Sequence, residues 1–140
     1  MSRHRPIRGR AVLVLVATLL VAACNDSGTA PPPGIQPQIV NNTDAFSYQI
    51  TNLSAVTGTY TYTWQNTGTL AKVTHASNAG GTGTATLTLK DANGTQVYTG
   101  PFASSGQVTS SPAGVAGAWT VMVTYANYSN AQVNFAVAKQ

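Results

Sequence analysis

Apolar and polar residues alternate with a period of two along most of the chain from Ile39 to Gln140, which constrains the fold more than any other feature. Successive side chains of a β-strand point to opposite faces, so this alternation predicts strands with one buried face. The apolar sets are Phe46, Tyr48 and Ile50; Tyr60, Tyr62 and Trp64; Ala85, Leu87 and Leu89; Trp119, Val121, Val123 and Tyr125; and Val133, Phe135 and Val137. No window shows helical spacing of apolar residues over three turns, so we expect an all-β domain.

Turn-forming residues separate the expected strands. They are Asn66–Gly68, Asn78–Gly81, Asp91–Gly94, Ser111–Gly114 and Asn127–Asn130. The pair Asn93-Gly94 is the strongest turn signal, because both residue types tolerate positive φ, and it predicts a hairpin between residues 87–89 and 95–99. Short strands at this spacing predict a two-sheet antiparallel β-sandwich, jelly-roll or immunoglobulin-like, of roughly seven to nine strands.

The N-terminus has the composition of an export signal. Four arginines lie within residues 1–10, and an apolar run extends from Ala11 to Ala23. A membrane-spanning helix needs about 20 apolar residues, and this run ends sooner, at the polar Asn25 and Asp26. We therefore expect a signal helix that inserts transiently and is then cleaved.

The residues Val21-Ala22-Ala23-Cys24 resemble the lipobox of bacterial lipoprotein precursors, although the family most often has Leu at the position of Val21. The resemblance implies cleavage after Ala23 and attachment of a diacylglyceryl group and fatty acids to Cys24. It places the chain in the cell envelope, with the lipid as its contact to the membrane. Asn25 rather than Asp after the cysteine favours the outer membrane over the inner one in a Gram-negative cell. The alternative is an ordinary signal peptide with an incidental cysteine.

The chain divides into three segments. Residues 1–23 are the expected signal peptide, and residues 24–38 are the expected lipidated cysteine and a disordered linker rich in Pro and Gly. Pro31, Pro32 and Pro33 favour an extended polyproline II conformation in this linker. Residues 39–140 form the β-sandwich, and their number suits a single domain.

The charge of the domain differs from that of the whole chain. The net charge is +4, but all four arginines lie in the expected signal peptide. The remaining charged residues are Lys72, Lys90 and Lys139, which balance Asp26, Asp44 and Asp91. A domain without a basic patch is not expected to bind nucleic acid. Cys24 is the only cysteine, so the fold cannot contain an intrachain disulfide.

The chemistry-bearing residues are few. After the signal segment the chain has one histidine, His75, and no glutamate. His75 shares a strand face with Val73 and is expected to be a partly buried sheet residue, so we expect no enzyme activity and no cofactor. One histidine without a free cysteine cannot bind zinc. Asp91 and Asn93 are weak calcium candidates, but turn capping by their own side chains explains both residues without a metal.

A second resemblance covers about half of the domain. The segments 87–98, 117–123 and 133–137 are similar to the jelly-roll modules of the pre-peptidase C-terminal type, which are appended to secreted bacterial proteases. The resemblance implies a module that binds calcium or an insoluble polymer. The acidic residues that would bind calcium are nearly absent from this sequence.

Two functions remain open. The first is a binding or adhesion module for a glycan, a polymer or an envelope protein, with Tyr98 at a strand end and Tyr128 in a turn as the exposed aromatic candidates. Trp64 and Trp119 alternate with threonine and are expected in the core. The second is a structural or assembly role through pairing of strand edges, which few charges protect in this sequence.

Overall fold

The computed structural model describes residues 35–102, 106 and 108–140, and its described part is an all-β, antiparallel fold. The expected signal helix, Cys24 and most of the expected linker lie outside the described residues. The strands are β1 (Gln38–Asn42), β2 (Ala45–Asn66), β3 (Ala71–His75), β4 (Thr82–Lys90), β5 (Gln96–Pro101), β6 (Val108–Ser110) and β7 (Gly117–Lys139). Within these residues no helix is long and apolar enough to cross a membrane.

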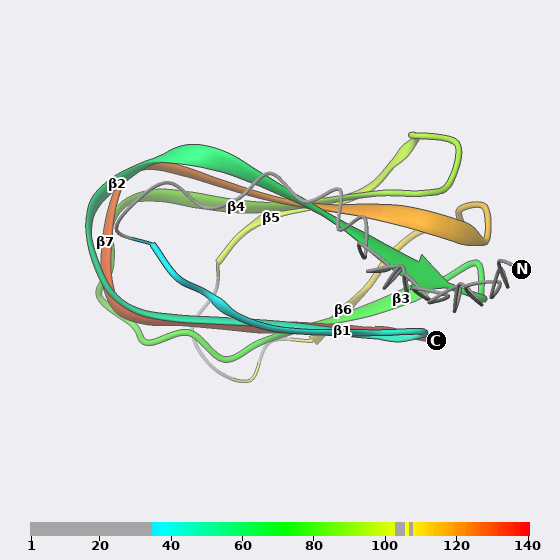
Figure 1. Cartoon of the computed structure of the whole chain (residues 1–140), viewed down its shortest axis with the longest axis horizontal. Coiled ribbons are helices and arrows are strands. Elements are labelled where there is room, and N and C mark those ends of the chain that lie inside the picture. Colours follow the sequence, from blue (N-terminus) through cyan, green and yellow to red (C-terminus); the bar gives the residue numbers. More distant parts are fainter. Residues whose placement is uncertain (1–34, 103–105, 107) are drawn as a thin grey trace, which may run out of the picture.

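Two long strands, β2 and β7, form the central pair of the fold. They contain 22 and 23 residues and pair antiparallel from Ala45 opposite Ala138 to Asn66 opposite Gly117. Both strands turn through a wide bend at the left of Figure 1. The expectation of separate short strands was wrong here, because residues 46–50 and 60–64 belong to one strand. Residues 119–125 and 133–137 belong to the other, and Asn127–Asn130 is not a turn.

The bend lies between the alternating sets of each long strand. The residues there resemble turn sequences because the strands bend at that point. The β2–β7 register shifts between Leu53 and Val56 and again between Val56 and Gly58. Such bulges bend a strand and increase its twist. Hydroxyl groups replace ladder bonds there, because the Asn127 N–H donates to Thr57 Oγ1 at 2.9 Å and the Ala55 N–H donates to Ser129 Oγ at 2.8 Å. Polar side chains thus support a bend within continuous strands.

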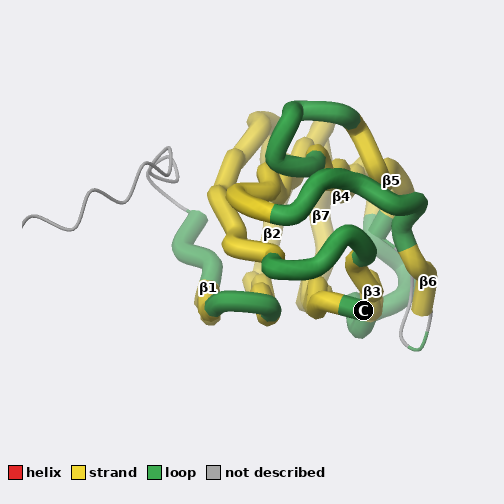
Figure 2. Tube along the Cα trace, turned by 90° about the vertical axis from the view of Figure 1, so that its right-hand side faces the viewer, coloured by secondary structure: helices red, strands yellow, loops and turns green. Residues whose placement is uncertain are grey.

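The bend folds a single sheet back on itself. The first half of β2 and the second half of β7 lie with β1, β3 and β6, whereas the other two halves lie with β4 and β5. Figures 1 and 2 show these two halves of the sheet facing each other. All seven described strands belong to one hydrogen-bonded sheet, because β2 and β7 run through both halves.

The core lies between the two halves and contains the alternating apolar sets. Trp64 and Trp119 are fully buried, as predicted, and their rings meet edge to face with centroids 5.8 Å apart. Contacts between the halves include the Phe102 and Phe135 rings at 5.4 Å and a hydrogen bond from the Tyr125 hydroxyl to the Tyr48 hydroxyl. The period-two pattern therefore predicted the buried faces of β2, β4 and β7 correctly.

The hairpin predicted at Asn93-Gly94 is confirmed. Thr88 pairs with Thr99 in the β4–β5 ladder, and Gly94 has a φ of 80°. The Gly94 N–H donates to the carbonyl of Asp91 at 2.9 Å, which closes the turn. Only Gly94 in this turn has positive φ, so its geometry is not that of a type I′ turn.

Core packing includes the first of the described residues. The side chain of Ile35 is buried with the core, and β1 starts at Gln38. Ile35 follows the Pro- and Gly-rich sequence, and burial of its apolar side chain ties this residue to the core.

Candidate functional site

A pocket of about 720 Å³ opens between the β3–β4 connection and the adjoining parts of β4 and β5. Its lining combines amide, hydroxyl and backbone groups with aromatic rings and contains no charged side chain. The lining residues are Asn78, Ala79, Gly80, Gly81, Gly83, Thr84, Ala85, Thr86, Thr99, Gly100, Pro101, Phe102 and Tyr128. Its volume lies within the usual range of small-ligand sites, which is about 300 to 1,000 Å³.

Tyr128 forms part of the pocket wall from β7. Its hydroxyl accepts a hydrogen bond from Asn130 Nδ2 at 2.9 Å, and the same amide donates to the carbonyl of Asn78 at 3.0 Å. Gly81 lies so close that a Cβ there would be 2.8 Å from the Tyr128 hydroxyl. The expectation that Tyr128 is exposed in a turn was wrong, since it lies within a strand and is 6% exposed.

Phe102 supplies the second aromatic ring and was not predicted as a site residue. It directly follows β5, and its N–H donates to the carbonyl of Ala85 at 3.0 Å. Its half-buried ring stacks on Tyr125 with centroids 6.1 Å apart and meets the edge of His75 at 6.2 Å. Phe102 lies outside every alternating set, so no pattern in the sequence could have placed it.

Tyr98, the other predicted ligand-binding residue, is half-buried and is not part of the pocket lining. Its hydroxyl lies 3.0 Å from His75 Nε2, and burial raises the pKa of this hydroxyl above its usual value. The structure therefore does not bring Tyr98 and Tyr128 together in one site.

His75 is a buried sheet residue, as its place beside Val73 predicted. It is 2% exposed, and burial lowers the pKa of its imidazole below 6.5. Nε2 pairs with Tyr98, and Nδ1 has no hydrogen-bond partner among the described residues. The described residues contain no group of three or more His, Cys, Asp or Glu side chains positioned to hold a metal.

Asp91 binds backbone groups through both carboxylate oxygens. Oδ1 accepts from the N–H groups of Asn93 at 3.0 Å and Thr95 at 2.9 Å, and Oδ2 accepts from Val115 N–H at 3.0 Å. Burial acts to raise the pKa of Asp91, but these N–H bonds outweigh it and keep the pKa below its usual value. The carboxylate joins the β4–β5 turn to the segment before β7, and this accounts for Asp91 and Asn93 as turn residues.

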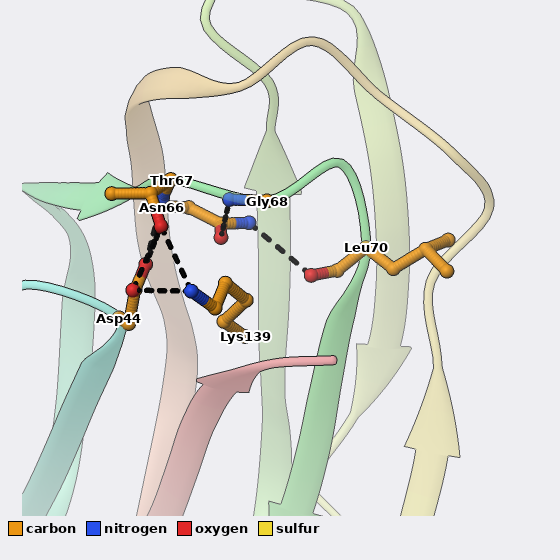
Figure 3. A network of polar contacts seen from close by, with 6 residues as sticks. All are labelled: Asp44, Asn66, Thr67, Gly68, Leu70 and Lys139. Atoms are coloured by element: carbon orange, nitrogen blue, oxygen red, sulfur yellow. Dashed lines mark hydrogen bonds and ion pairs between the residues drawn. The ribbon is translucent and has the colours of Figure 1, made fainter.

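A polar network around Asp44 joins two connections to the end of β7 (Figure 3). Lys139 Nζ donates to Asp44 Oδ2 at 2.7 Å, and the Thr67 N–H donates to Asp44 Oδ1 at 2.7 Å. The hydrogen bond from Lys139 and that from the Thr67 backbone lower the pKa of Asp44 to about 2. The network includes the only ion pair among the described side chains and lines no part of the pocket.

Comparisons with known proteins identify no family. A scan against protein-family models gives no match, and a search of curated proteins gives none either. Among solved structures, the chain is similar to a structure of infectious bursal disease virus Gt strain, with 14% identity and a TM-score of 0.29. The similarity covers 76% of this chain and 32% of the other, so this chain spans about a third of that protein's length. A TM-score this low supports no conclusion about fold or function.

Proposed function

We propose that this chain is a lipid-anchored lipoprotein of the cell envelope whose domain is a non-catalytic binding module for an uncharged, hydroxyl-rich ligand, such as the end of a neutral glycan. The observation that carries the proposal is the pocket beside Tyr128 and Phe102, which has polar and aromatic groups but no charged side chain.

The chemistry of the pocket suits a sugar. The C–H faces of a sugar ring pack on aromatic rings, and the half-buried Phe102 ring offers such a surface at the pocket wall, while the hydroxyls of the sugar bond to amide, hydroxyl and backbone groups. Thr84, Thr86 and Asn78 supply such groups at the pocket wall. Because Trp64 and Trp119 are buried, a flat platform of exposed tryptophans is not the binding mode, and we place recognition in the pocket.

The anchor and the finer fold complete the proposal. The lipobox resemblance at Val21–Cys24 supports a diacylglyceryl and fatty acyl anchor on Cys24, with the outer membrane favoured in a Gram-negative cell. The two facing halves of the folded sheet support classification as a β-sandwich related to jelly-roll or immunoglobulin-like folds. Mass spectrometry of the mature N-terminus tests the anchor, because a chain that begins elsewhere or carries no lipid at Cys24 contradicts it.

Calorimetric titration with a panel of neutral oligosaccharides tests the pocket. We expect at least one member to bind, and Thr86→Trp to weaken that binding about tenfold or more, because the indole fills the pocket. The matched control is Thr88→Trp, which places the same side chain two residues further on the same face of β4, outside the pocket. If no member binds, or if both variants bind equally well, the pocket is not the ligand site.

A further inference from the structure

The second half of β2 forms a free edge of the sheet. Residues 58–66 pair with β7 on one side. On the other side β1 pairs only with the first part of β2, from Ala45 to Gln49. No other strand of the described residues pairs with residues 58–66, so this stretch has a neighbouring strand on one side only.

The backbone groups that point away from β7 can be identified from two hydrogen bonds. The carbonyl of Thr63 accepts from Asn41 Nδ2 at 2.8 Å, and the carbonyl of Gln65 accepts from the Asp44 N–H at 2.8 Å. In an antiparallel ladder, the N–H and C=O of a residue point to one side, and the side alternates along the strand. Thr59 and Thr61 have the same parity as Thr63, so their N–H and C=O groups point outward, with no backbone partner among the described residues.

The other edges carry features that hinder pairing with another chain. Pro101 ends β5, and a register irregularity between Leu89 and Lys90 interrupts its ladder. β1 has five residues, and β6 has three and lies beside Lys72. The free edge of β2 has no proline and no charged residue between Thr57 and Asn66. Short strands, prolines, bulges and lysines are the usual protection of sheet edges, and residues 59–66 have none of them, since the register irregularity of β2 ends at Gly58.

We propose that this edge pairs antiparallel with the same edge of a second copy of the chain, with Thr59 opposite Thr61 of the second copy. A two-fold axis that relates identical strands makes their pairing antiparallel and self-complementary. In this register the N–H and C=O groups of Thr59 form hydrogen bonds with those of Thr61 in the second copy. The Thr63 carbonyl keeps its hydrogen bond from Asn41. It also places Tyr60 opposite its own counterpart.

The side chains on this edge fit pairing with a second copy. Threonine already faces threonine across strands in the same half of the sheet, with Oγ1 atoms 3.2 Å apart between Thr59 of the edge and Thr124 of β7 and also between Thr88 and Thr99. Cross-strand threonine pairs stabilise a sheet, and an edge without charged side chains brings no like charges together. The outward backbone groups and the uncharged side chains of this edge are complementary to those of the same edge in antiparallel register. A second copy of the chain is therefore the partner that fits it.

Sedimentation equilibrium of residues 25–140, which contain the whole described core, tests the proposal. We expect a reversible monomer–dimer equilibrium for the wild type. Thr61→Pro removes an N–H that points away from β7 and forms no hydrogen bond with it. An edge strand tolerates proline at such a position. We expect this change to weaken dimerisation about tenfold or more, because reciprocal bonds are lost. The matched control is Thr99→Pro on the edge of β5, which we expect to leave dimerisation unchanged.

A second variant keeps the backbone intact. Thr61→Lys retains the N–H but places two ammonium groups near the two-fold axis, so the dimer should weaken at low salt and recover at high salt. Circular dichroism confirms that each variant is folded. A wild type that stays monomeric at all concentrations, or equal weakening by Thr61→Pro and Thr99→Pro, overturns the proposal. A Thr61→Lys dimer with wild-type affinity at low salt overturns it as well.

Discussion

The hydroxyl of Tyr125 donates a hydrogen bond to the hydroxyl of Tyr48, with the two oxygens 3.1 Å apart, in the interior between the two halves of the folded sheet. Both side chains are almost fully buried. Burial raises the pKa of each tyrosine far above its usual value, so both hydroxyls are protonated at neutral pH. The bond therefore joins the two halves of the sheet through neutral groups.

Tyr48→Phe should destabilise the fold by about 1 to 3 kcal/mol, because the buried Tyr125 hydroxyl then has no acceptor. Tyr125→Phe should cost a similar amount. The double variant should cost less than the sum of the two, since neither hydroxyl is then left unpaired. Urea denaturation of the four proteins measures the coupling, and additive losses would show that the bond contributes nothing.

Gly83 at the start of β4 and Gly80 in the β3–β4 connection provide a matched pair. Both have positive φ, 77° and 87°, but a Cβ at Gly83 would collide with the Asn127 carbonyl at the bend of β7, whereas Gly80 faces open space. Gly80→Ala should therefore cost only the backbone strain, about 1 to 2 kcal/mol. Gly83→Ala should cost about 3 kcal/mol or more, because the start of β4 must move away from β7. Thermal unfolding compares them, and equal losses would contradict the close approach.

The Asp44 network predicts a dependence of stability on acid. The folded pKa of Asp44 is about 2, against 3.8 for the free side chain, so the unfolded chain binds the proton more tightly. The stabilisation is complete above pH 3.8 and is lost as the pH falls towards 2. Asp44→Asn should therefore lower the melting temperature at pH 6 and have a much smaller effect near pH 2. Lys139→Gln should show the same trend, and an effect independent of pH would contradict it.

The sequence predicted the local structure of this protein better than its connectivity. Alternation identified the buried faces, and Asn93-Gly94 identified the β4–β5 hairpin, because both signals depend on neighbouring residues. The segment Asn127–Asn130 looked like a turn because its residues favour one. Its N–H groups and side chains instead bond across to β2, and this pairing of residues some seventy positions apart in the chain leaves no local trace.

The candidate site was harder to predict for the same reason. Tyr128 was predicted as an exposed aromatic residue, but it is buried because Asn130 and the loop at Gly81 pack against it. Phe102 joins the pocket only because β5 ends beside Ala85. The alternation of residues along a strand indicates which side faces inward, but not where two loops leave a cavity.

His75 should make the stability of the domain fall in mildly acidic solution. Burial lowers its folded pKa below 6.5, so the unfolded chain takes up the proton first as the pH falls. The contribution of neutral His75 to the free energy of unfolding is complete above pH 6.5 and is lost below that value. The free energy of unfolding then falls by at most about 1.4 kcal/mol per pH unit. His75→Phe keeps a ring against Phe102 and removes the proton site, so its free energy of unfolding should be flat between pH 7 and pH 5. Chemical denaturation across this range measures both slopes. His75 is the only histidine after residue 4, and Asp44 and Asp91 have lowered pKa values, so these aspartates do not titrate between pH 7 and pH 5. If His75→Phe retains the slope, His75 is not its source.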